Sequence, residues 1–170
     1  MILDKRHLSQ IAIMILEALL FSQAFSRHDS IHELPTSIIA FLAIFLSAEV
    51  VFNIQAHAQV GEPIFVGNQR HDLISINDIG FYFLSAHPSA TFYHELYPGV
   101  VTTRDVQKAI AGEITSQGVN WIVLVDTGRS YDPNASSISS GVHYLDDNIR
   151  SRYVRVAEFG IYEIWTMMAK

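Results

Sequence analysis

Apolar residues crowd the first third of the chain in two long runs. Residues 8–25 read LSQIAIMILEALLFSQAF, and residues 38–52 read IIAFLAIFLSAEVVF. Polar residues interrupt both runs, among them Glu17 in the first and Glu49 in the second. A bilayer span needs about 20 mainly apolar residues, and a carboxylate at its centre costs about 2.5–3.5 kcal/mol. Both runs are therefore borderline as membrane spans.

Charges and helix-start signals around these runs suggest how they are used. Lys5 and Arg6 precede the first run, which favours a cytoplasmic N-terminus. Pro35 and the hydroxyl residues after it predict a helix start before the second run. We therefore expect a membrane-anchor helix in residues 1–33 and an apolar linking helix, buried or interfacial, in residues 34–58. A single span, which we favour, places the rest of the chain outside the cytoplasm, whereas two spans return it there.

The pattern changes near residue 59, where short apolar runs alternate with turn signals. The predicted strands are residues 64–66, 91–94, 119–125, 154–159 and 161–165, and the predicted helices are residues 77–86, 102–117 and 142–153. The third strand is nearly continuous in β-branched and aromatic residues, which is typical of a strand covered on both faces. We therefore expect an α/β fold over residues 59–170, a three-layer α/β/α sandwich with a small, mainly parallel sheet and an antiparallel C-terminal hairpin.

Composition narrows the classes of function. Of the 170 residues, 49% are hydrophobic and only 16% are charged, against roughly 25% charged in soluble domains. This balance supports a membrane-associated protein. The net charge of −6 and the scattered basic residues argue against nucleic-acid binding. Cysteine is absent, which excludes a disulfide scaffold, a thiolate zinc site and a cysteine nucleophile.

Polar residues follow two of the predicted strands. Arg70, His71 and Asp72 come after the first strand, and Asp126 comes directly after the third. Ligands of open α/β sheets bind near the carboxyl ends of strands, so Arg70, His71 and Asp126 are candidate ligand-binding residues. Arg70 and His71 suit a phosphate or a carboxylate, and Asp72 is expected to orient His71. A hydrogen-bonded loop is the alternative, because neither a dinucleotide fingerprint nor a P-loop lysine is present.

A second group of polar residues falls on the last predicted helix. His143 and Asp147 are four residues apart and share one face of that helix. Together with Asp146, His94 and Glu95, they raise the possibility of a divalent metal site. Helical zinc motifs pair two histidines with a third ligand, and this spacing does not supply that set. We therefore expect a helix cap or surface hydrogen bonds here, with no metal and no cofactor.

Several stretches together resemble one family. They are Ile64–Asn68 with Arg70-His71-Asp72, Phe81–Leu84, Tyr93–Leu96 before Pro98-Gly99, Trp121–Val125, Leu145-Asp146-Asp147 with Ile149-Arg150 and Tyr153, and Glu158-Phe159-Gly160 with Tyr162–Trp165. This set is similar to the extracytoplasmic C-terminal domain of bacterial membrane glycosyltransferases of the dolichyl-phosphate-mannose–protein mannosyltransferase type (glycosyltransferase family 39, GT-C architecture). The similarity covers about residues 34–168, and its C-terminal part is the most specific.

The resemblance implies a polyprenyl-phosphate-linked sugar donor and an inverting transfer to a lipid, glycan or protein acceptor. The family's catalytic aspartates lie in an early loop of a many-helix membrane domain, which this sequence lacks, so no catalytic residue is carried over. We therefore expect a truncated or accessory portion of such an enzyme, not catalytic alone, in the inner membrane with residues 59–170 extracytoplasmic. Its expected partners are membrane lipid and, through a partner membrane domain, a polyprenyl-phosphate sugar or a glycan acceptor. The alternatives are a membrane-anchored binding module and a small hydrolase built on Asp126 and His143.

Overall fold

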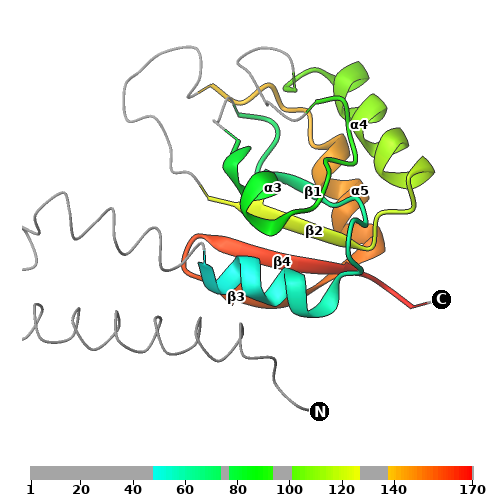
Figure 1. The fold of residues 1–170 in the computed structure, drawn as a ribbon. Coiled ribbons are helices and arrows are strands. Elements are labelled where there is room, and N and C mark those ends of the chain that lie inside the picture. The colour runs from blue at the N-terminus through cyan, green and yellow to red at the C-terminus, as the bar shows by residue number, and fades with distance from the viewer. Residues whose placement is uncertain (1–47, 74–76, 94–100, 127–137, 170) are drawn as a thin grey trace, which may run out of the picture. The chain divides into compact units, whose positions relative to one another are not determined.

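The computed structural model describes residues 48–73, 77–93, 101–126 and 138–169 (Figure 1). The chain divides into two units, Met1–Phe45 and Leu46–Lys170, and every described residue belongs to the second unit. The anchor helix expected in residues 1–33 therefore lies outside the described residues. Within the described part of the chain, every helix is too short or too polar to cross a membrane.

The described strands form one mixed sheet with the strand order β1-β2-β4-β3 (Figure 1). They are β1 (Phe65–Asn68), β2 (Trp121–Val125), β3 (Tyr153–Phe159) and β4 (Tyr162–Met167). β1 and β2 run parallel, whereas β4 is antiparallel to both β2 and β3. The α/β class and the antiparallel C-terminal hairpin are confirmed. The expected predominance of parallel pairs is wrong, because the hairpin places β4 beside β2 and contributes both antiparallel pairs.

The strand expected at residues 91–94 is absent from the described part of that segment. Residues 91–93 are bent or irregular, and just before them a parallel bridge joins Ser89 to Ile64 at the edge of the sheet. The Ser89 hydroxyl donates to the carbonyl of Thr91, and the Thr91 hydroxyl donates to the carbonyl of Tyr93. Local side-chain bonds of this kind compete with a strand ladder, which explains the irregular backbone.

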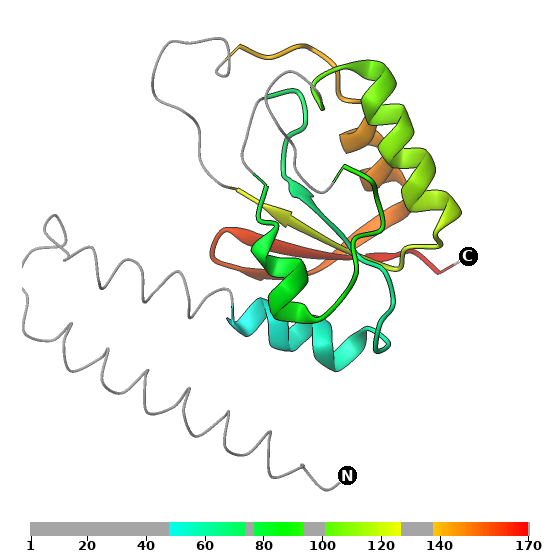
Figure 2. The ribbon, with the colours of Figure 1, turned by 45° about the horizontal axis from the view of Figure 1, so that its top comes forward.

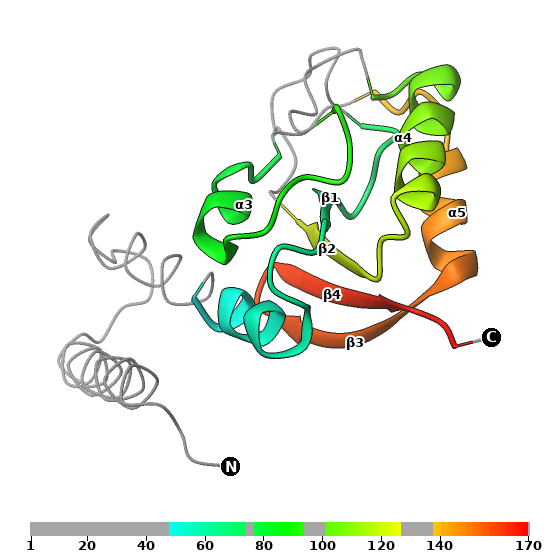
Figure 3. The same ribbon diagram turned by 45° about the vertical axis from the view of Figure 1, so that its right-hand side comes forward.

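Helices pack on both faces of the sheet (Figures 2 and 3). α4 (Arg104–Ser116) and α5 (Tyr144–Arg152) cover one face. The helical residues 48–57 and α3 (Gly80–Ser85) cover the other face. Of the linking helix expected over residues 34–58, residues 48–57 are thus helical and packed on the sheet, and the part before residue 48 lies outside the described residues.

β2 contributes to both cores, as its apolar run predicts. Ile122 and Leu124 pack in the core beneath α4 and α5, whereas Val123 and Val125 pack in the opposite core. This division follows from the alternation of side chains along a strand. The parallel strands β1 and β2 end at the same edge of the sheet. The helices that cover the two faces therefore determine what surrounds the residues after each strand.

Candidate functional site

Residues that follow β1 meet the start of α5, although they lie 75 positions apart in the sequence. The Nδ1 atom of His71 is 2.7 Å from Oδ1 of Asp146, and the backbone N–H of His71 donates to Oδ2 of Asp146 at 3.3 Å. Both side chains are buried. We call the five side chains that gather here the polar cluster: Arg70, His71, Asp72, His143 and Asp146.

Asp72 is fully buried and is held by Arg70. The guanidinium donates from Nε to Oδ1 at 2.9 Å and from Nη2 to Oδ2 at 2.6 Å, and the Ser139 hydroxyl also donates to Oδ2. The hydrogen bond from Arg70 is the main reason why the pKa of Asp72 falls from 3.8 to about 2. The same bond raises the pKa of Arg70 above its usual value.

The ring of His71 is therefore oriented by Asp146 and not by Asp72. The expectation that Asp72 orients His71 is wrong, because both oxygens of Asp72 accept from Arg70, whereas Asp146 lies beside the imidazole. The other side of the ring lies against Gly67, where an added Cβ would sit 2.8 Å from Nε2 of His71 and 2.7 Å from the ring of Phe65. A side chain at position 67 would displace one of these rings, which accounts for the glycine at this point of β1.

His143 stands at the border of the polar cluster, with 47% of its side chain exposed. Its Nδ1 atom is 3.8 Å from Oδ1 of Asp72 and 3.7 Å from Oδ2 of Asp146. Both distances exceed the range of a hydrogen bond. One ligand atom from each of these three residues lies within 4.8 Å of the other two. One imidazole and two carboxylates form a donor set that divalent metal ions bind.

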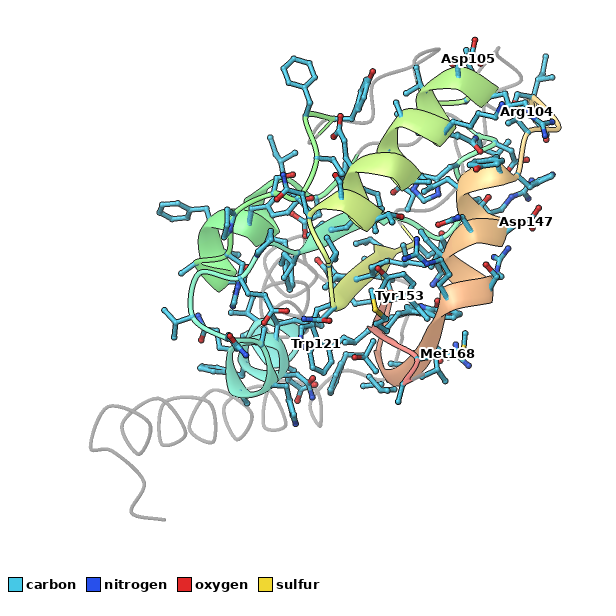
Figure 4. The ribbon with its side chains drawn as sticks, turned by 90° about the vertical axis from the view of Figure 1, so that its right-hand side faces the viewer. Arg104, Asp105, Trp121, Asp147, Tyr153 and Met168 are labelled. Carbon is cyan, nitrogen blue, oxygen red and sulfur yellow. The ribbon has the colours of Figure 1, made fainter. Side chains whose placement is uncertain are left out.

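This arrangement differs from the metal group considered on the last predicted helix. Asp146 is buried, whereas Asp147 is exposed and projects outward from α5, away from the sheet (Figure 4). His94 and Glu95 lie outside the described residues. The helical spacing of four residues selected Asp147, but the residue that joins His143 is three positions along, and its partner Asp72 comes from the loop after β1.

Gln107 on α4 fixes the backbone around the polar cluster, although it is not among the residues predicted from the sequence. Its buried Nε2 group donates to the carbonyls of His71 and Val142, both at 2.9 Å, and its Oε1 accepts from the N–H of Leu145 at 3.0 Å. A lone glutamine matches no motif. The available signal was its spacing, because Gln107 is three positions before Ile110 and so lies on the apolar face of α4.

Asp126 follows β2 and is exposed. Its backbone N–H donates to the carbonyl of Ile161 at 2.8 Å, which continues the pairing of β2 with the hairpin. Its carboxylate takes part in none of the hydrogen bonds or ion pairs of the polar cluster. Of the three ligand-binding candidates, Arg70 and His71 thus belong to the polar cluster, whereas Asp126 lies on the surface.

The polar cluster combines buried negative charge with partly exposed hydrogen-bond donors. Its buried carboxylates are paired, its guanidinium and one imidazole are partly exposed, and a buried amide secures the backbone.

Comparison of the sequence with models of protein families and with curated proteins finds no match.

Proposed function

We propose that this chain is a noncatalytic accessory part of a membrane glycosyltransferase that uses a polyprenyl-phosphate-linked sugar. In this proposal the chain is anchored in the inner membrane, and residues 59–170 are extracytoplasmic. The observation that carries the proposal is that two stretches of the family resemblance, Arg70-His71-Asp72 and Leu145-Asp146-Asp147, meet in the polar cluster. Residues that carry the resemblance therefore connect the loop after β1 to α5. Two stretches that are distant in the sequence but belong to the same resemblance are thus in contact in the fold.

The pairing within the polar cluster supports a role without bond-making chemistry. A general base must reach a substrate proton within hydrogen-bond distance. Asp72 is buried and accepts from Arg70 and Ser139, while Asp146 is buried and pairs with His71. Carboxylates engaged in this way are not placed to take a proton from a substrate.

Arg70 is the residue of the polar cluster best suited to contact a ligand. Its side chain is 42% exposed, and a guanidinium has more N–H donors than the two that Arg70 directs to Asp72. Asp72 also fixes its orientation, which lowers the entropic cost of binding. An oriented, exposed guanidinium suits the phosphate of the donor or a carboxylate of the acceptor.

A transfer assay tests this proposal. Membranes from cells that lack the chain are expected to lose sugar transfer from a polyprenyl-phosphate donor, and purified full-length chain is expected to restore it. The variant Arg70→Ala is expected to restore less transfer, whereas Arg150→Ala, at an exposed arginine of α5, serves as the matched control. The purified chain alone is expected to transfer no sugar. Transfer by the chain alone overturns the noncatalytic role, and unchanged transfer in membranes without the chain overturns the accessory role.

Protease treatment of intact spheroplasts tests the proposed topology. A peptide tag at the C-terminus is expected to be removed before lysis, because the proposal places residues 59–170 outside the cytoplasm. A tag that survives until the cells are lysed contradicts this orientation. A cytoplasmic marker protein provides the control for membrane integrity.

The second candidate function is a membrane-anchored interaction module without a transferase partner. Exposed apolar side chains on α3 favour it: 87% of Phe83 and 54% of Leu84 is accessible to solvent. Exposed apolar surface of this kind marks contact sites in many proteins. The same deletion separates the two candidates, because loss of an unrelated interaction module leaves sugar transfer unchanged.

A further inference from the structure

We propose that Asp72, His143 and Asp146 bind one divalent metal ion of the zinc type. This inference goes beyond the proposed function and does not depend on it. It concerns the junction between the loop after β1 and the first turn of α5, which the three ligands would connect.

The spacing of the ligand atoms fits such an ion. Nitrogen and oxygen ligands lie about 2.0–2.2 Å from zinc, which places the ligands of a tetrahedral site about 3.3–3.6 Å apart. Nδ1 of His143 is 3.8 Å from Oδ1 of Asp72 and 3.7 Å from Oδ2 of Asp146. A shift of a few tenths of an ångström by the half-exposed ring of His143 brings its Nδ1 atom to coordination spacing from both oxygens, and all three ligand atoms already lie within 4.8 Å of one another.

The second observation that supports a metal site is the position of the His143 ring between two carboxylates. Its Nδ1 atom faces two carboxylate oxygens and makes a hydrogen bond to neither, nor to any other group in the described part of the chain. An imidazole nitrogen beside a buried carboxylate ordinarily approaches to about 2.7–3.0 Å, as His71 does on the other side of Asp146. An ion between the three residues explains why His143 is oriented toward both carboxylates but stays at a longer distance.

The surrounding residues hold the two carboxylates in place for this role. His71 donates to Asp146, and Arg70 and Ser139 donate to Asp72, as ligating carboxylates in metal sites are themselves hydrogen-bonded. Each carboxylate oxygen has a second lone pair, so these bonds leave Oδ1 of Asp72 and Oδ2 of Asp146 able to coordinate.

Charge and access also favour the site. Asp72 is paired with Arg70 and Asp146 with the imidazole of His71, and a dication would add positive charge beside these two buried carboxylates. His143 is 47% exposed, so an ion can enter from its side and keep one coordination position for water. The donor set of one imidazole and two carboxylates matches Zn²⁺ better than Mg²⁺ or Ca²⁺, which prefer oxygen ligands alone.

Titration of the chelator-treated full chain with zinc chloride tests the inference. Calorimetry is expected to show that the wild-type chain binds one zinc ion through Asp72, His143 and Asp146. The variant His143→Ala is expected to bind this ion at least about tenfold more weakly. The matched controls Asp147→Ala and His57→Ala, at an exposed aspartate and an exposed histidine, are expected to bind as the wild type does. Absence of binding by the wild type, or equal binding by His143→Ala, overturns the proposal.

Cobalt substitution provides a second measurement that needs no variant to fold. The wild-type chain with one equivalent of Co²⁺ is expected to give the intense visible absorption of a four-coordinate ion, and addition of zinc should abolish it. A spectrum of hexa-aqua cobalt overturns the proposal. The sugar-transfer assay measures a different property, so failure of the metal site and failure of the accessory role are distinguishable.

Discussion

The loops that follow β1 and β2 begin at the same edge of the sheet but enter different surroundings. After β1, Asp72 is fully buried and pairs with Arg70. After β2, Asp126 is exposed. The same strand-end rule predicted a functional role at both places. The difference comes from residues far away in the sequence, because Gln107 of α4 and Asp146 of α5 contact the first loop. A strand end therefore fixes where a polar side chain starts, and long-range packing decides whether it becomes part of a site.

Removal of Asp146 is expected to have the largest effect on this contrast. Asp146→Ala leaves His71 buried without its partner, and breaking a buried pair costs about 3–5 kcal/mol in the free energy of unfolding. Denaturant unfolding monitored by circular dichroism measures the loss. Asp147→Ala is the matched control at the next position, where the carboxylate is exposed, and is expected to change stability by no more than about 0.5 kcal/mol. Equal losses in the two variants would show that the inward-facing carboxylate has no special role.

Gln107→Leu is expected to have the next largest effect. Leucine keeps the volume of the side chain but leaves the carbonyls of His71 and Val142 and the N–H of Leu145 without their partner. Unsatisfied buried groups cost about 1–3 kcal/mol each, and partial relaxation makes a loss of about 2–3 kcal/mol reasonable for the variant.

Two measurements distinguish this effect from a general loss of helix stability. Hydrogen exchange at the amide of Leu145 is expected to accelerate more than exchange in β2. Gln117→Leu, at an exposed glutamine after the end of α4, is the matched control and is expected to be close to wild type. Exchange that accelerates uniformly across the sheet would contradict a local role for Gln107.

Local patterns in the sequence predicted much of the fold. The helix predicted over residues 102–117, the apolar run of β2 and the strands predicted on either side of Gly160 each depend on near neighbours, and each corresponds to an observed element. The pairing of β4 with β2 could not be read from these patterns, because a hairpin can add to a sheet on either side. The strand predicted at residues 91–94 does not form in residues 91–93, because hydroxyl side chains satisfy the backbone there locally.

The candidate site was predictable only in part, for the same reason. The strand-end rule located Arg70 and His71, which depend on the end of β1 alone. Their partners Asp146 and Gln107 belong to helices whose arrangement over the sheet follows from tertiary packing. A helical wheel places Asp146 and Asp147 on different faces, but it does not say which face covers the loop after β1.

Acidification is expected to lower the stability of the chain by protonating the buried Asp72 after β1. Because its pKa falls from 3.8 to about 2 in the folded chain, its contribution to stability is complete above about pH 4 and disappears as the pH falls toward 2. This shift corresponds to about 2 kcal/mol in the free energy of unfolding. Denaturant unfolding between pH 5 and pH 2, with a chelator present, measures it.

Asp72→Asn provides the reference for this titration. The variant cannot ionise at position 72, so its stability is expected to fall less steeply between about pH 4 and 2 than that of the wild type. Its stability at neutral pH is expected to be lower, because the amide offers Arg70 no charge. Parallel pH profiles for the two proteins would contradict the assignment of the shift to the pair of Asp72 and Arg70.

Asp126→Ala is expected to have the smallest effect and tests the other half of the comparison. The side chain is exposed, and alanine keeps the backbone N–H that donates to the carbonyl of Ile161 at 2.8 Å. Surface substitutions of this kind change the free energy of unfolding by about 0.5 kcal/mol or less. The variant is also expected to restore sugar transfer as fully as the wild type, because the hydrogen bonds that hold the polar cluster together come from other residues. A destabilisation as large as that of Asp146→Ala would contradict the difference between the two loops, because the fold would then depend on the exposed carboxylate as much as on the buried one.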